Sequence, residues 1–163
     1  MISFTSWLET TALSVWVREA PTMFAFPFIL IVHAWGMGII AGGNAAIDLR
    51  ILGFAPRVPL SAMAKFYPVM WFGFAINAIS GFLLLMGYPT KALTNPVFYL
   101  KLLCIAVGMV LMSRLRRRVV PEDSPPPNAK VMAALSLIVW AGAIVSGRLL
   151  AYTCKYLLGD LSC

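Results

Sequence analysis

Long apolar runs separated by short polar stretches dominate this chain. The first run, residues 22–46, contains only His33 and Asn44 as strongly polar members. Because an α-helix rises about 1.5 Å per residue, a run of this length crosses a hydrocarbon core of about 30 Å. Three further runs have the same character. The pattern therefore predicts four membrane-spanning helices, at residues 22–46, 66–86, 96–114 and 129–152.

Turn and cap residues indicate where these spans begin and end. The second run stops at the turn-like residues 87–89, and the pair Asn95-Pro96 suits a helix cap followed by proline in the first turn. Three consecutive prolines in the loop 121–128 predict a break before the fourth span.

Ahead of the first span, residues 3–18 predict a short interfacial helix. Phe4, Trp7 and Val15 lie near one helical face and Glu9 lies elsewhere, as in helices that rest on a membrane surface. A flexible tail is the alternative. Because these residues lack a basic start and a small-residue cleavage site, we expect them to remain in the mature protein.

Composition supports a membrane location. Hydrophobic residues make up 61% of the 163 residues and charged residues only 12%, and the mean hydropathy is +0.86. A soluble domain has about half apolar residues. The expected fold is thus all-α, a single membrane domain over 1–163 that forms a four-helix bundle in contact with the lipid bilayer.

The net charge of +7 indicates topology rather than a nucleic-acid partner. Short loops rich in Lys and Arg face the cytoplasm. The loops after the first and third spans hold eight basic residues: Arg50, Arg57, Lys65, Arg114, Arg116, Arg117, Arg118 and Lys130. The opposite side holds three: Arg18, Lys91 and Lys155. Both termini are therefore expected on the periplasmic side.

Polar residues gather at one depth of the predicted bundle. His33 lies roughly 16 Å into the first span at the helical rise, and intramembrane ionisable groups are candidates for function by default. Antiparallel threading brings six side chains to the periplasmic half, with Asn77 slightly below the rest: His33, Asn77, Ser80, Lys101, Arg148 and Tyr152. These predict one shared pocket.

Each of these residues also has a structural interpretation. Lys101 and Arg148 lie close enough to the interface to reach the headgroups. Asn77 and Ser80 suit hydrogen bonds between helices, and His33 suits one as well. Asp48 is expected only to mark the cytoplasmic end of the first helix.

Small residues predict close helix packing. Gly38 and Gly42 form a GxxxG pair in the first span, where such pairs let backbones approach. Gly36 is expected to leave room for a flat ligand beside His33. Met37 lies one turn from His33 and offers a copper ligand, although core packing is the favoured role.

Cysteine placement predicts one bridge. Cys154 and Cys163 both lie beyond the periplasmic end of the fourth span, where thiols oxidise, so a disulfide between them is expected. Two unpaired thiols on a frayed tail are the alternative. Cys104, inside the third span, is expected to stay reduced.

Three stretches carry a family resemblance: VHAWGMGIIAGGNAAIDLRILGF, NPVFYLKLL and AALSLIVWAGAIVSGRLLAY. Together they resemble a bacterial family of small four-helix membrane proteins of unknown function, over residues 25–153. The resemblance implies the fold and a bacterial inner-membrane location but no activity.

A more distant resemblance rests on a histidine before a glycine-rich helix and on a later Leu-Lys-Leu. These features are similar to the HemJ-type protoporphyrinogen oxidases and to the CopD copper-resistance family. The HemJ resemblance implies that His33 and Lys101 are a functional pair. The chain departs from that pattern because it has no further histidine to supply a second haem ligand, and because it adds Arg148, suited to a carboxylate or propionate.

Three functions follow as hypotheses. The leading one is a redox-associated membrane protein whose pocket binds haem b, a porphyrin or a quinone, with His33 as metal ligand or hydrogen-bond partner and Lys101 and Arg148 as anion contacts. The second is a noncatalytic subunit or scaffold that docks a membrane or periplasmic protein partner. The third is copper passage. The spans hold no nucleophile–base or carboxylate pair, which argues against a hydrolase and leaves catalysis itself open.

Overall fold

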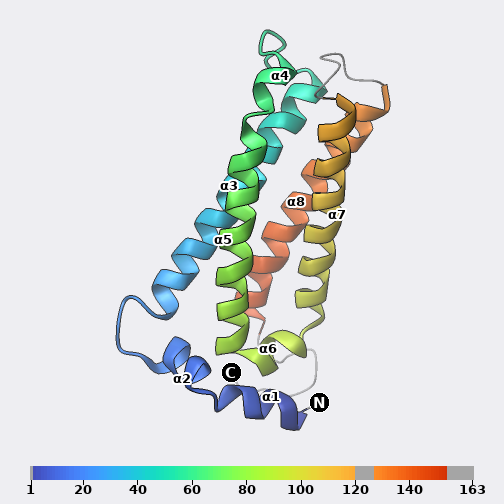
Figure 1. Cartoon of the computed structure of the whole chain (residues 1–163). Coiled ribbons are helices and arrows are strands. Elements are labelled where there is room, and N and C mark those ends of the chain that lie inside the picture. Colours follow the sequence, from blue (N-terminus) through green and yellow to red (C-terminus); the bar gives the residue numbers. More distant parts are fainter. Residues whose placement is uncertain (1, 120–126, 154–163) are drawn as a thin grey trace.

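Four long helices run side by side along the molecule (Figure 1). The computed structural model describes residues 2–119 and 127–153. The long helices are α3 (Phe26–Leu52), α5 (Phe66–Gly87), α7 (Pro96–Val119) and α8 (Pro127–Tyr152). All four are long and apolar enough to cross a membrane. The chain is therefore a multi-pass integral membrane protein with an all-α four-helix bundle, as the hydropathy pattern predicts.

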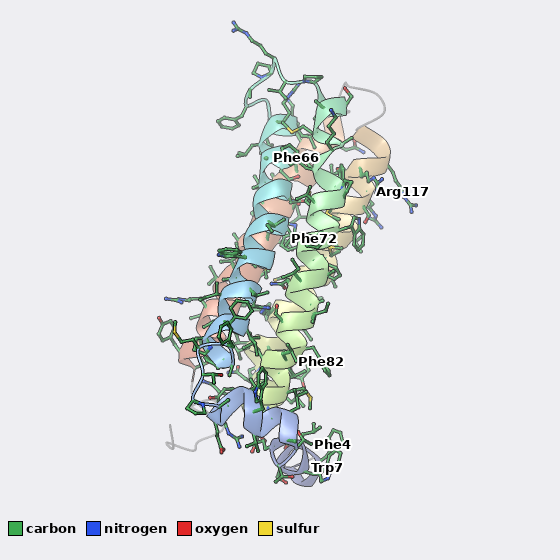
Figure 2. All side chains as sticks on the ribbon, turned by 60° about the vertical axis from the view of Figure 1, so that its left-hand side comes forward. Phe4, Trp7, Phe66, Phe72, Phe82 and Arg117 are labelled. Atoms are coloured by element: carbon green, nitrogen blue, oxygen red, sulfur yellow. The ribbon has the colours of Figure 1, made fainter. Side chains whose placement is uncertain are left out.

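The bundle exposes apolar side chains around its circumference. On α5, Phe66, Phe72 and Phe82 point away from the other helices (Figure 2), with 43%, 64% and 58% of their surface exposed. Contiguous exposed apolar surface of this kind needs an apolar solvent. The inward faces bury a core that includes Ile40 and Trp140. Lipid thus covers the helices along their length.

All four spans extend beyond a predicted end, α5 only by Gly87. α3 begins at Phe26, with proline in its first turn, and continues past residue 46 to Leu52, where Gly53 adopts φ 109°. A left-handed glycine is a common helix stop. α7 likewise runs through the arginine cluster to Val119, and α8 starts at Pro127. Hydropathy locates the apolar part of a helix, whereas backbone hydrogen bonds continue until a stop residue.

The N-terminal segment forms two helices rather than the single interfacial helix predicted over 3–18. These are α1 (Ile2–Glu9) and α2 (Ala12–Glu19). The break falls at Thr10–Thr11, because the Thr11 hydroxyl accepts a hydrogen bond from Ser14 N at 3.4 Å and so caps α2. Both helices lie across one end of the bundle, against the ends of α5 and of a short helix, α6 (Pro89–Leu93) (Figure 1).

The two ends of the bundle differ. One carries α1, α2 and α6 and is called the α6 end below. The other carries the short helix α4 (Leu60–Met63) and the arginine cluster and is called the α4 end. The charge distribution predicts that the α6 end is periplasmic.

Helices α3 and α5 approach through Gly36 rather than through the predicted GxxxG pair. A Cβ atom at Gly36 would lie 2.8 Å from both the backbone nitrogen of Asn77 and the backbone oxygen of Gly73. Gly38 and Gly42 are exposed, and no atom of the described residues lies within 4 Å of a Cβ atom built there. Gly36 therefore serves backbone contact and leaves no room for a flat ligand.

The cysteines are only partly described. Cys104 is a free, half-buried thiol on α7, and its sulfur would lie 3.3 Å from a Cβ atom at Gly142 on α8. It therefore packs between the two helices. The predicted bridge between Cys154 and Cys163 falls outside the described residues.

Candidate functional site

His33 lies on α3 and faces α5, which holds its imidazole from one side. Its Nδ1 is 3.1 Å from the backbone oxygen of Asn77 and 3.1 Å from the Ser80 hydroxyl. That hydroxyl donates to Ile76 O at 2.6 Å, which leaves its oxygen to accept from the imidazole. With two acceptors at Nδ1, the hydrogen-bond network assigns the proton of a neutral ring to that atom. Nε2 is then left with a lone pair.

Lys101 on α7 meets that lone pair. Its Nζ lies 3.2 Å from Nε2 of His33. An ammonium group has three protons to donate and no capacity to accept. One N–H bond is directed at the imidazole, and the described residues provide no hydrogen-bond acceptor for the others. The helix that carries Lys101, α7, is capped by Asn95. The Asn95 side chain accepts a hydrogen bond from Val97 N at 3.0 Å and donates one to the Thr153 hydroxyl at 2.8 Å. The predicted cap at Asn95 is confirmed.

The two side chains line a cavity of about 390 Å³ near the α6 end. All four long helices and α6 contribute to its wall, which is mostly aliphatic and aromatic. The described polar groups of the wall are His33, Lys101, Lys91 and Tyr88. An apolar cavity of a few hundred Å³ with a few convergent polar groups is typical of a small-molecule site.

Small residues make space for the polar pair. A Cβ atom at Gly81 would lie 3.0 Å from Cε1 of His33, and one at Gly147 would lie 3.5 Å from Cε of Lys101. The glycine on α5 therefore fits against the ring, and the glycine on α8 lies beside the lysine chain.

The structure brings together four of the six residues predicted for the pocket. Asn77 and Ser80 contact His33 from behind, and Asn77 Nδ2 also donates to the backbone oxygen of His33 at 2.9 Å. These two residues are buried and orient the imidazole, without contributing to the cavity wall. Asn77 and Ser80 thus form hydrogen bonds between α5 and α3, and the same bonds orient the His33 ring in the site.

Arg148 and Tyr152 lie outside the cavity. Both are exposed, and the Arg148 guanidinium carbon lies 5.2 Å from the centre of the Tyr152 ring. Similar depth along the membrane does not imply a common direction, because successive residues of a helix differ by about 100° around its axis. Gly147 faces Lys101, and its neighbour Arg148 turns outward.

Lys91 and Tyr88 line the cavity but are not among the site residues that the sequence predicts. They belong to α6 and to the junction before it, a segment whose sequence indicates only a turn. Lys91 Nζ lies 3.4 Å from the backbone oxygen of Ala151 on α8, and the Tyr88 ring packs edge-on to Phe26 with centroids 5.8 Å apart. Lys91 supplies the second cationic group that was expected from Arg148.

The metal-binding capacity of the site is small. Within the described ranges, no group of three or more His, Cys, Asp or Glu side chains is placed to hold a metal ion. Met37 packs against the core, the role that the sequence favours over copper binding. His33 Nε2 is the metal-ligating atom that the described cavity wall offers.

Comparison of the chain with protein-family models, with curated proteins and with solved structures gives no significant match.

Proposed function

We propose that the cavity binds a lipid-soluble quinone or quinol, which would make this a redox-associated membrane protein. The observation that carries the proposal is the contact between Lys101 Nζ and His33 Nε2, at 3.2 Å, in the wall of an apolar cavity. The half-buried N–H donor of Lys101 and the half-buried lone pair of His33 lie side by side. Together they suit a ring whose oxygen is a carbonyl in one redox form and a hydroxyl in the other.

The chemistry of the pair fits both forms. A quinone carbonyl accepts a hydrogen bond from a free N–H of Lys101. A quinol hydroxyl donates to His33 Nε2 once the lysine turns from that atom toward the ligand oxygen. Because Asn77 and Ser80 keep the proton at Nδ1, the ring presents the same acceptor in either case.

The rest of the wall suits the remainder of such a ligand. Leu30, Leu84 and Leu85 provide apolar surface for a ring and the start of an isoprenoid tail. The surrounding lipid accepts the tail itself. A cavity with an apolar wall inside a membrane protein thus suits a lipid-soluble ligand.

A porphyrin is the second candidate, and one observation favours it. The residues that the HemJ resemblance pairs, His33 and Lys101, lie in contact although 68 positions separate them. For a haem, His33 Nε2 would ligate the iron after Lys101 moved aside. Lys91 and Lys101 would pair with the propionate carboxylates. The described wall offers no second axial His, Met or Cys ligand, so this fits five-coordinate haem.

The test is equilibrium binding of a short-chain ubiquinone analogue to the full chain in mild detergent. Lys101→Met keeps the length of the side chain and removes its charge. A lost charge-assisted hydrogen bond costs about 1.5–3 kcal/mol, or roughly 10- to 150-fold in Kd.

Arg148→Met is the matched control, because it removes a cation at similar depth on the exposed face. It should leave Kd unchanged. Equal effects of the two variants, or none from Lys101→Met, would contradict the quinone site. Haemin added to the same samples tests the porphyrin: a Soret band that is lost in His33→Ala supports it, and loss of quinone binding in wild type on haemin addition shows a shared cavity.

A further inference from the structure

A second polar group lies inside the bundle, about 22 Å from His33 along α3 at the helical rise of about 1.5 Å per residue. Asp48 is on the same helix, toward the α4 end, and its surface is 0% exposed. The sequence suggests only a helix-end residue here. The structure instead encloses the carboxyl group between α3 and α8.

The carboxyl group is only half satisfied. Asn44 Nδ2 donates to Asp48 Oδ2 at 2.5 Å and to the Ser136 hydroxyl oxygen at 2.7 Å. Asn44 and Ser136 are themselves 2% and 0% exposed. The other carboxyl oxygen, Oδ1, is buried and has no hydrogen-bond partner in the described part of the chain.

Among the described residues, no cation forms an ion pair with this carboxyl group. The ion pair found among the described residues is Arg18–Glu19, at the opposite end. Arg50, two positions along α3, donates to the backbone oxygens of Pro56 and Val58. From α7, the Arg116 guanidinium carbon lies 5.2 Å from the centre of the Tyr67 ring of α5.

The other groups near this end are neutral or exposed. Tyr67, 1% exposed, interacts electrostatically with both Asp48 and Arg116. Lys65, which precedes α5, and Lys130 in α8 are exposed. From α8, the group that faces the carboxyl is the hydroxyl of Ser136.

If Asp48 were ionised, its buried Oδ1 would have neither a hydrogen-bond donor nor a counter-ion. Burying a charge in this way costs several kcal/mol or more in a low-dielectric interior. A carboxylic acid avoids most of that cost. A sodium ion would avoid it as well, but it needs a cage of oxygens, whereas the Asn44 amide presents its N–H group to both neighbours. The geometry favours the proton.

We propose that Asp48 is a proton-binding site of the membrane domain. One proton adds to Oδ1 to form the neutral carboxylic acid and leaves again toward the α4 end, where α3 ends four residues later at Leu52. Asn44, which is itself bonded to Ser136, holds Oδ2 in place during the exchange. The site is independent of the ligand proposed for the His33 cavity.

The test uses dicyclohexylcarbodiimide, an apolar reagent that adds to protonated carboxyl groups within membranes. Full-length protein in membranes is treated across a pH series and analysed by peptide mass spectrometry. We expect an adduct on Asp48 that decreases as the pH rises, and none on Glu19, whose side chain is 61% exposed and paired with Arg18. Asp48→Asn should lose the adduct entirely, and Asp48→Glu should keep it.

Replacing potassium by sodium at fixed pH separates the two cations. Sodium-specific protection of Asp48 would overturn the proton site in favour of a sodium site. Infrared spectroscopy decides the case in which the reagent does not reach the carboxyl group. A protonated carboxyl C=O band that is present in wild type and absent in Asp48→Asn supports the proposal, and its absence from wild type overturns it.

Discussion

Gly81 lies directly against the imidazole of His33, so that a Cβ atom at this position would be 3.0 Å from Cε1 of the ring. This distance is shorter than an ordinary van der Waals contact. The ring is therefore confined between α5 and Lys101, with hydrogen bonds on one edge and a glycine against its flank. Its orientation depends on the absence of a side chain at position 81.

Gly81→Ala should weaken binding of the quinone analogue more than it weakens the fold. The added methyl group pushes the ring by a few tenths of an ångström and misaligns Nε2. A cost of about 1 kcal/mol, at the lower end of over-packing effects, raises Kd roughly fivefold. Gly147→Ala is the control, since its methyl group would meet Lys101 at an ordinary 3.5 Å. A larger effect from Gly147→Ala would show that the lysine, and not the ring, is the constrained partner.

Gly36→Ala should destabilise the bundle, whereas Gly38→Ala should not. The first methyl group would lie 2.8 Å from backbone atoms of α5, which cannot move without separating the helices. Over-packing of this kind costs about 1–3 kcal/mol. The second would meet no described atom within 4 Å. Thermal unfolding in detergent compares the two, and equal melting temperatures would contradict the α3–α5 contact.

The α6 end is predicted to face the periplasm. Alkaline phosphatase fused after Cys163 should be active, and green fluorescent protein fused at the same place should be dark, because the first folds after export and the second in the cytoplasm. Fusions at Arg57, in the opposite loop, should give the reverse pattern. Fluorescence from the fusion after Cys163 would invert the orientation and place the His33 cavity in the cytoplasmic half.

A bridge between Cys154 and Cys163 remains a prediction that follows from this orientation. Alkylation of fresh membranes without reduction, followed by mass spectrometry, should modify neither thiol, and reduction should expose both. Cys104, free and half-buried on α7, serves as the internal thiol control. Alkylation of both Cys154 and Cys163 before reduction would exclude the bridge.

Hydropathy predicts the spans because uninterrupted apolar runs of this length are typical of membrane-spanning helices. Depth along those spans also brought His33, Lys101, Ser80 and Asn77 to one level. Depth carries no information on rotation, however, and for that reason depth alone predicts Arg148 and Tyr152 in a pocket from which they point away. Helical rotation relative to partner helices depends on packing, which hydropathy does not encode.

Asp48 shows a different limit. A charged residue near Arg50 at the end of an apolar run is ordinarily a boundary marker. The chain continues in helical form to Leu52, and this extension carries the carboxyl group into contact with Asn44 and, through it, Ser136 of α8. The signal that could have revealed it is the four-residue spacing of Asn44 and Asp48, which places both on one helix face.

Helix α2 is synthesised well before α5, the helix against which it packs. The Ser14 hydroxyl lies 3.5 Å from the backbone oxygen of Gly87, 73 positions later in the chain, and Val17 fills the space that a side chain at Gly87 would need. At roughly 5–20 residues per second, the ribosome takes roughly 4 to 15 s to make the intervening segment. During that interval residues 12–19 have no α5 to pack against. Residues 12–19 are thus translated well before the helix against which they pack. The exposed rings of Phe4, Trp7 and Trp16 offer apolar surface that suits a lipid interface during that interval.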